Sequence, residues 1–171
     1  TLLWPDHDPS SARAEVRRMI WALNKSLGKE WLAVDREAVA LLPQPGLWLD
    51  VAQFRHLLGT GQSHGHPAGE LCPACLDSLT KAVALARGDF LAGFHLSHNE
   101  PFADWQRRQQ EFLQRKMLDA LHNLAETAVS QQNFPLAEKY ARHQIELDNL
   151  QESAWRQLMT AQAGNGRRPE A

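Results

Sequence analysis

The sequence predicts a mainly α-helical fold, in which one helix and a short β-hairpin precede a larger domain of packed helices. Apolar residues recur at helical spacing over about 100–131, 135–147 and 151–163. Near the N-terminus, a shorter helical stripe is followed by two brief apolar runs of the kind found in hairpins. Residues 34 positions apart also resemble one another in the last third of the chain, which indicates a helical repeat.

Length and composition fit a folded protein of one or two small domains. The 171 residues are 43% hydrophobic, and the net charge of −2 gives no general sign of nucleic-acid binding. Two cysteines close together exclude a disulfide framework that spans the fold. No apolar run reaches the roughly 20 residues of a membrane helix, and no signal peptide is recognisable. We therefore expect a cytoplasmic protein with no membrane contact.

The first predicted element is a helix that begins at Ser10 or Ser11, either of which can cap it. Gly28 is suited to end this helix. Its apolar stripe consists of Val16, Ile20, Leu23 and Leu27. From residue 10 to residue 29 the chain has five basic residues and a single acidic one, so the polar face of the helix is locally basic.

A β-hairpin with strands over about 31–35 and 38–42 follows this helix. A basic helix followed by a hairpin is the order of the last half of a winged helix-turn-helix, whose helix enters the major groove of DNA. We therefore expect residues 1–47 to be the C-terminal part of such a DNA-binding domain. The residues expected to read base edges are Arg13, Arg17 and Asn24, and those expected to contact phosphates are Arg18, Lys25 and Arg36. A helix whose arginines are merely solvated is the alternative.

The middle of the chain predicts a short helix over 51–58, with Asp50 as its cap, and then a loop over 59–69. A second helix is expected over 73–87. A turn then precedes three apolar residues that we expect to pack between helices, Phe90, Leu91 and Phe94.

A candidate metal site lies in and after the loop, formed by His64, His66, Cys72 and Cys75. A Cys-x-x-Cys turn at a helix N-terminus holds both sulfurs on one side and favours thiolates. With the two histidines, the group could hold a structural zinc ion with no open coordination position. The cysteines could instead be a reduced, half-buried pair or form a local disulfide. A thioredoxin-like redox dithiol is disfavoured, because no βαβ pattern surrounds them.

The last third predicts a tetratricopeptide-type repeat, in which small residues let two antiparallel helices approach closely. The large and small positions of its first unit are Leu121, Leu124, Ala125, Ala128, Ala137 and Ala141. The matches one period later are Leu121 with Trp155, Leu124 with Leu158, Ala125 with Met159, and Ala137 with Ala171. An ordinary helical-hairpin bundle with a chance period is the alternative. Because the second unit is cut, we expect the chain to be a piece of a longer polypeptide.

Several segments in this order resemble the bacterial transcriptional activator domain of SARP/AfsR-type regulators, together with the end of the winged helix that precedes it. The residues that carry the resemblance best are 48–51, 88–94, Phe102, Trp105 and the 34-residue unit. The resemblance covers nearly the whole chain and implies that residues 48–171 are the all-helical activator domain, truncated at its C-terminus. It also implies DNA binding, self-association, and contacts with RNA polymerase or other transcription proteins.

No catalytic pattern is recognisable, since the chain lacks a Gly-x-Ser-x-Gly elbow, a phosphate-binding glycine loop and a His-Glu-x-x-His motif. We therefore predict a DNA-binding transcriptional activator that is not an enzyme. The alternative is a protein-interaction scaffold of the tetratricopeptide type, tethered by zinc and without DNA binding. The two hypotheses differ in whether the basic face within residues 10–42 contacts DNA or packs on protein.

Overall fold

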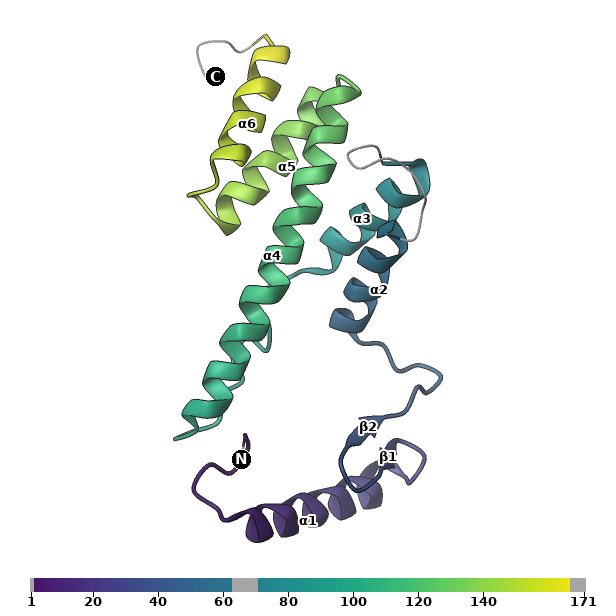
Figure 1. The fold of residues 1–171 in the computed structure, drawn as a ribbon. Helices are drawn as coiled ribbons and strands as arrows, with labels where there is room; N and C mark the ends of the chain where they lie inside the picture. Colours follow the sequence, from purple (N-terminus) through teal and green to yellow (C-terminus); the bar gives the residue numbers. More distant parts are fainter. Residues whose placement is uncertain (1, 63–70, 167–171) are drawn as a thin grey trace. The chain divides into compact units, whose positions relative to one another are not determined.

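The computed structural model describes residues 2–62 and 71–166, which form six helices and one two-stranded hairpin (Figure 1). Their contacts divide the chain into two units. The N-terminal unit comprises Thr1–Trp48 and Gly93–Arg107, and the helical unit comprises Leu49–Ala92 and Arg108–Ala171. This mainly helical fold, with a small hairpin before the larger helical region, confirms the predicted fold class.

The N-terminal unit contains the predicted helix and hairpin. Their bounds are α1 (Pro9–Leu27), β1 (Leu32–Val34) and β2 (Val39–Leu41). The two strands are antiparallel, and Ala33 lies opposite Ala40 at their centre. The turn between the strands is closed by Asp35, whose carboxylate accepts the backbone N–H groups of Glu37 (2.7 Å) and Ala38 (2.8 Å). These two bonds lower the pKa of Asp35.

The predicted cap of α1 is wrong, because the cap is Asp8 and neither Ser10 nor Ser11. The Asp8 carboxylate accepts the backbone N–H groups of Ser10 (2.9 Å) and Ser11 (3.2 Å), and it also accepts both serine hydroxyls. The hydroxyls first, and then the N–H groups, hold the pKa of Asp8 far below its usual range. The charged cap therefore stabilises α1 above the ordinary carboxyl pKa, and this contribution is lost as the pH falls through the lowered pKa.

Residues 93–107 complete the N-terminal unit and include the start of α4 (Glu100–Ser130). The Asn99 side chain accepts the backbone N–H of Phe102 (3.0 Å), as a helix cap does, and donates to the carbonyl of Leu3 (3.0 Å). Phe102 is buried, with its ring centroid 5.7 Å from that of Phe94 and 5.4 Å from that of Trp105. Phe94 and Leu91 both stay exposed, so their predicted packing between helices is wrong, whereas Phe90 is half-buried.

The helical unit holds the remaining helices and most of α4. Their bounds are α2 (Asp50–Gln62), α3 (Pro73–Leu85), α5 (Phe134–Leu147) and α6 (Glu152–Gly164). Helix α2 runs past residue 58 into the segment predicted as a loop. Its last turns pack Leu57 and Leu58 on the core, and this packing offsets the roughly 1 kcal/mol that each glycine costs in a helix. Asp50 is the first residue of α2, where its carboxylate accepts the N–H of Val51 (2.7 Å).

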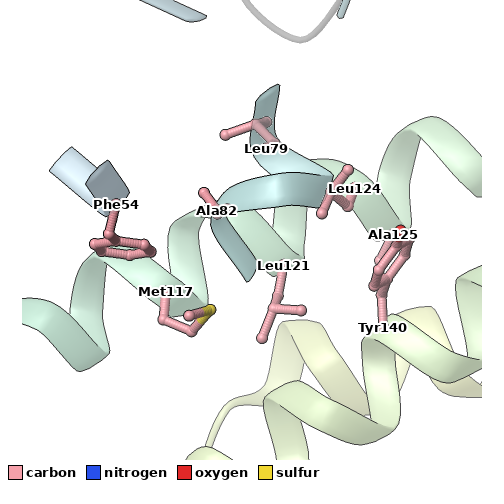
Figure 2. Close-up of a cluster of buried hydrophobic side chains, with 9 residues drawn as sticks. Phe54, Leu79, Ala82, Met117, Leu121, Leu124, Ala125 and Tyr140 are labelled. Atoms are coloured by element: carbon pink, nitrogen blue, oxygen red, sulfur yellow. The ribbon is translucent and has the colours of Figure 1, made fainter. Parts of the chain in front are cut away.

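The main core lies where α2 and α3 meet α4 and α5 (Figure 2). Its buried side chains are Phe54, Leu79, Ala82, Met117, Ala120, Leu121, Leu124, Ala125 and Tyr140. A second, smaller cluster joins α4, α5 and α6 through three alanines, Ala128, Ala137 and Ala161. Small side chains at these positions let the three helices approach closely, as the predicted repeat requires.

A buried polar network also links the last three helices. The Gln144 side-chain amide of α5 donates to Gln157 of α6 (2.9 Å), whose own amide nitrogen lies 3.0 Å from His122 Nδ1 of α4. The Gln157 amide also donates to the backbone carbonyl of His122 (3.3 Å). Because Gln144 is fully buried, these bonds fix how α5 and α6 pack on α4.

The 34-residue period appears in the burial pattern at some of the predicted positions. Leu124 and Leu158 are both buried, and so are Ala120 and Ala154 one turn earlier. Leu121 and Ala125 are buried, whereas their predicted counterparts on α6, Trp155 and Met159, are exposed. Ala171 lies outside the described residues. The assignment to the tetratricopeptide type stays a prediction.

Candidate functional site

The first candidate site is the polar face of α1, which carries most of the residues predicted to bind DNA. At about 100° per residue, Arg13, Arg17 and Asn24 fall within roughly 40° of one another around the helix. Arg18 and Lys25 lie roughly 80–140° further round the helix. All four cations are exposed, and Arg36 is exposed in the turn between β1 and β2. Helix α1 therefore presents exposed cations on two lines along its length, about 100° apart.

The cations of this face differ in their partners. Arg18 pairs with Glu15 at 2.7 Å, and Lys25 Nζ lies 5.1 Å from the ring centroid of the exposed Trp21. Within the part of the chain that the structure describes, neither Arg13 nor Arg17 forms an ion pair. The charge of these two guanidinium groups therefore remains available to an anionic partner.

Asn24 is half-buried, unlike the arginines on the same line of the helix. Its side-chain oxygen is buried and has no hydrogen-bond partner among the described residues. An unsatisfied buried oxygen lowers the free energy of unfolding by about 1–3 kcal/mol, so this amide destabilises the helix face on which it lies. Its predicted contact with a base edge stays a prediction.

The second candidate site is the cysteine pair at the start of α3. Cys72 caps this helix through its sulfur, which accepts the backbone N–H of Cys75 (3.5 Å), and the two sulfurs lie 3.4 Å apart without a disulfide. Cys75 is 1% exposed and Cys72 is half-buried. Burial, and then the neighbouring Cys72 thiol, raises the pKa of Cys75. Both sulfurs lie on one side of the turn, as their spacing predicts.

The histidines of the predicted zinc site, His64 and His66, lie outside the described residues. Among residues 2–62 and 71–166, no group of three or more histidine, cysteine, aspartate and glutamate side chains could hold a metal ion. Binding of zinc by these four residues stays a prediction.

One surface was not recognised in the sequence, and we call it the α2–α4 groove. It has a volume of about 740 Å³ and lies between α2 and α4 of the helical unit. Four basic residues line it, Arg55, Arg108, Arg115 and Lys116, with Phe112 among them. The sequence does contain one pattern that indicates part of this surface. Arg108, Phe112 and Arg115 lie at positions i, i+4 and i+7, which share one face of a helix.

The described residues also contain no helix that is both long and apolar enough to cross a membrane. When the chain is compared with protein-family models, residues 49–171 match the model described as "Bacterial transcriptional activator domain". No curated protein matches the chain.

Proposed function

Because the chain belongs to the bacterial transcriptional activator domain family, which it matches over residues 49–171, we propose that it is a DNA-binding transcriptional activator. The family match is the observation that carries this proposal. The family is one of transcriptional regulators and not of enzymes, in agreement with the absence of a catalytic pattern in the sequence. The protein would act in the cytoplasm, where its DNA target lies.

In this proposal, residues 1–47 are the end of a winged helix, and α1 enters the major groove of DNA. The exposed guanidinium groups of Arg13 and Arg17, which have no ion pair among the described residues, support this role. Lys25, held beside Trp21, and Arg36 in the hairpin turn would contact phosphates, which position a protein on DNA without reading its sequence. Arg18 would exchange its ion pair with Glu15 for a phosphate.

The activator domain, residues 48–171, would supply the protein contacts of the regulator. We assign to it self-association and binding to RNA polymerase or other transcription proteins. Exposed apolar side chains on the helical unit, among them Phe112, Leu150 and Trp155, support an interaction role.

Replacing both Arg13 and Arg17 with alanine in the full-length protein is expected to weaken DNA binding at least tenfold. Each arginine that contacts a base is worth about 1–3 kcal/mol, and removing one that contacts a phosphate also lowers the salt dependence of binding. The measurement is fluorescence anisotropy on a duplex selected by the wild-type protein from a random library, at several salt concentrations.

The matched control for this experiment is Arg156→Ala, an exposed arginine on α6, which should bind as the wild type does. Unchanged affinity and salt dependence in the double variant would contradict the groove assignment of α1. A folded wild-type protein that selects no DNA sequence would favour the protein-interaction scaffold in its place.

We also propose that His64, His66, Cys72 and Cys75 bind a structural zinc ion. With Zn–S bonds of about 2.3 Å and tetrahedral angles, two ligand sulfurs lie roughly 3.8 Å apart. The observed separation of 3.4 Å between the Cys72 and Cys75 sulfurs is within a few tenths of an ångström of this value. The ion would tie the loop before α3 to the helix.

Elemental analysis of protein purified without a metal-affinity step is expected to find about one zinc ion per chain. The ion should be lost when Cys72 and Cys75 are both replaced with serine, because thiolates are the ligands that zinc prefers here. If the native protein contains no zinc, we would infer that the cysteines pack in the fold or form a local disulfide. The regulator proposal would be unchanged.

A further inference from the structure

The α2–α4 groove has an apolar floor formed by Phe54, Leu58 and Phe112. Phe54 is buried in the core of the helical unit, so the floor is a fixed part of the fold. Phe112 is 42% exposed, although an aromatic side chain of this size gains about 1.5–3 kcal/mol by full burial. The floor therefore offers an apolar contact to a side chain from outside.

The sides of the groove carry a net positive charge, because four basic residues and one acidic residue, Glu111, line it. Arg55 lies 5.8 Å from the ring centroid of Phe112 and donates a hydrogen bond to Gln109 (3.4 Å), so its guanidinium is held over the floor. No ion pair is found among the described residues for Arg55, Arg108 or Arg115. An apolar floor between unpaired arginines fits an apolar side chain that is flanked by carboxylates.

A surface of this complementary kind is present on the same unit, in the turn between α5 and α6. Leu150, at the tip of the turn, is 85% exposed, the most exposed of the large apolar side chains described. Asp148 and Glu152 flank it and form no ion pair with the described residues. We call this the Leu150 turn.

The Leu150 turn is held in one conformation by its own hydrogen bonds. The Asp148 carboxylate accepts the backbone N–H of Leu150 (3.0 Å). The Trp155 indole donates to the carbonyl of Asn149 (2.9 Å), which ties the turn to the first turns of α6. A preformed turn loses little conformational entropy on docking, so more of its contact energy becomes affinity.

We propose that the Leu150 turn of one copy of the chain docks in the α2–α4 groove of a second copy, with Leu150 on Phe112 and the flanking carboxylates beside the groove arginines. Figure 1 shows α2 on one side of α4 and the α5–α6 turn on the other, so a chain does not fill its own groove. The net charge of −2 gives little overall repulsion between copies. This contact would be the surface through which the chain self-associates. The inference therefore rests on the self-association in the proposed function.

DNA is a poorer occupant of this groove. A duplex offers no isolated apolar side chain for the floor, whereas the Leu150 turn presents one that is 85% exposed. The two surfaces of the contact are different, so a pair of chains joined by a single such contact keeps one groove and one turn open.

The test reverses the charge of each surface in turn. One variant carries Arg108→Glu with Arg115→Glu, and the other carries Asp148→Lys with Glu152→Lys. Sedimentation velocity over a concentration series is expected to show self-association of the wild type, weakened at least tenfold in either variant, because like charges then face each other. An equal mixture of the two variants should form heterodimers, because each supplies the surface that the other lacks.

Three further chains complete the design. All four substitutions in one chain should restore self-association, since the charges are then reversed on both sides. Leu150→Ala should weaken association and leave the circular dichroism spectrum unchanged. Lys139→Glu, an exposed charge reversal on α5 outside both surfaces, should associate as the wild type does.

A wild type that stays monomeric throughout the concentration series overturns the proposal. So do folded variants that associate as the wild type does, or a mixture in which no heterodimer forms. If the groove variant is monomeric and no longer binds DNA, the groove is a DNA-binding surface instead. The proposed function fails separately, when the Arg13 and Arg17 variant keeps full DNA affinity while the charge-reversal experiment gives the expected result.

Discussion

Replacing Leu121 with alanine is expected to lower the free energy of unfolding by about 3 kcal/mol, within a range of roughly 2–5 kcal/mol for buried leucines. Leu121 is 0% exposed and belongs to the cluster that joins α2, α3, α4 and α5 (Figure 2). Its removal leaves a cavity that its neighbours fill only in part, because Leu124 and Tyr140 are held by their own helices. Urea unfolding followed by circular dichroism at 222 nm measures this loss.

Leu150→Ala is the matched control for this first experiment. It makes the same chemical change at a side chain that is 85% exposed, so the free energy of unfolding should change by less than about 0.5 kcal/mol. Equal losses in the two variants would show that Leu121 does not hold the core. An unchanged free energy of unfolding in Leu150→Ala would also show that its effect on self-association does not come from unfolding.

Replacing Ala161 with leucine is expected to lower the free energy of unfolding by about 1–3 kcal/mol or to detach α6 from α4 and α5. Ala161 is 0% exposed and meets two other alanines, Ala128 and Ala137, where the three helices come together. A larger side chain has no space at this point unless the helices separate. Separation would also break the hydrogen bond between Gln144 and Gln157.

The same substitution two residues further along the helix provides the comparison. Ala163 is exposed on α6, so Ala163→Leu should leave the free energy of unfolding within about 0.5 kcal/mol of the wild type. Chemical denaturation of both variants, with amide hydrogen exchange of α6 as a second readout, distinguishes the two sites. If Ala161→Leu were as stable as Ala163→Leu, close packing of the repeat helices would be refuted.

The sequence was sufficient to predict the order of the elements and most of their ends. Apolar spacing at 3.6 residues is a strong signal over a long helix, and α4 was expected within about two residues of its observed ends. The cap of α1 was missed because Asp8, Ser10 and Ser11 are all good capping residues, and only the backbone path decides among them. The extension of α2 was missed because its glycines suggest a loop, whereas burial of Leu57 and Leu58 favours the helix.

The candidate sites were predictable to different degrees. The position of Cys72 and Cys75 on one side of a helix start follows from their spacing alone. The α2–α4 groove does not, because Arg55 comes from one helix and Arg108 from another far along the chain. Exposure of Trp155 could not be foreseen either, since the repeat pattern assigns that position to the interior. A surface formed by several helices leaves little recognisable pattern in the sequence of any one of them.

The division of the N-terminal unit into two stretches of chain bears on how the protein is made. Helix α1 and the hairpin leave the ribosome earlier than Asn99 and Phe102, which belong to the same unit but follow only after residues 49–92 have been synthesised. At about 5–20 residues per second, this delay is roughly 2–9 s. During that time the nascent N-terminal segment lacks the side chain that bonds to Leu3, so this unit is completed after synthesis of α2 and α3.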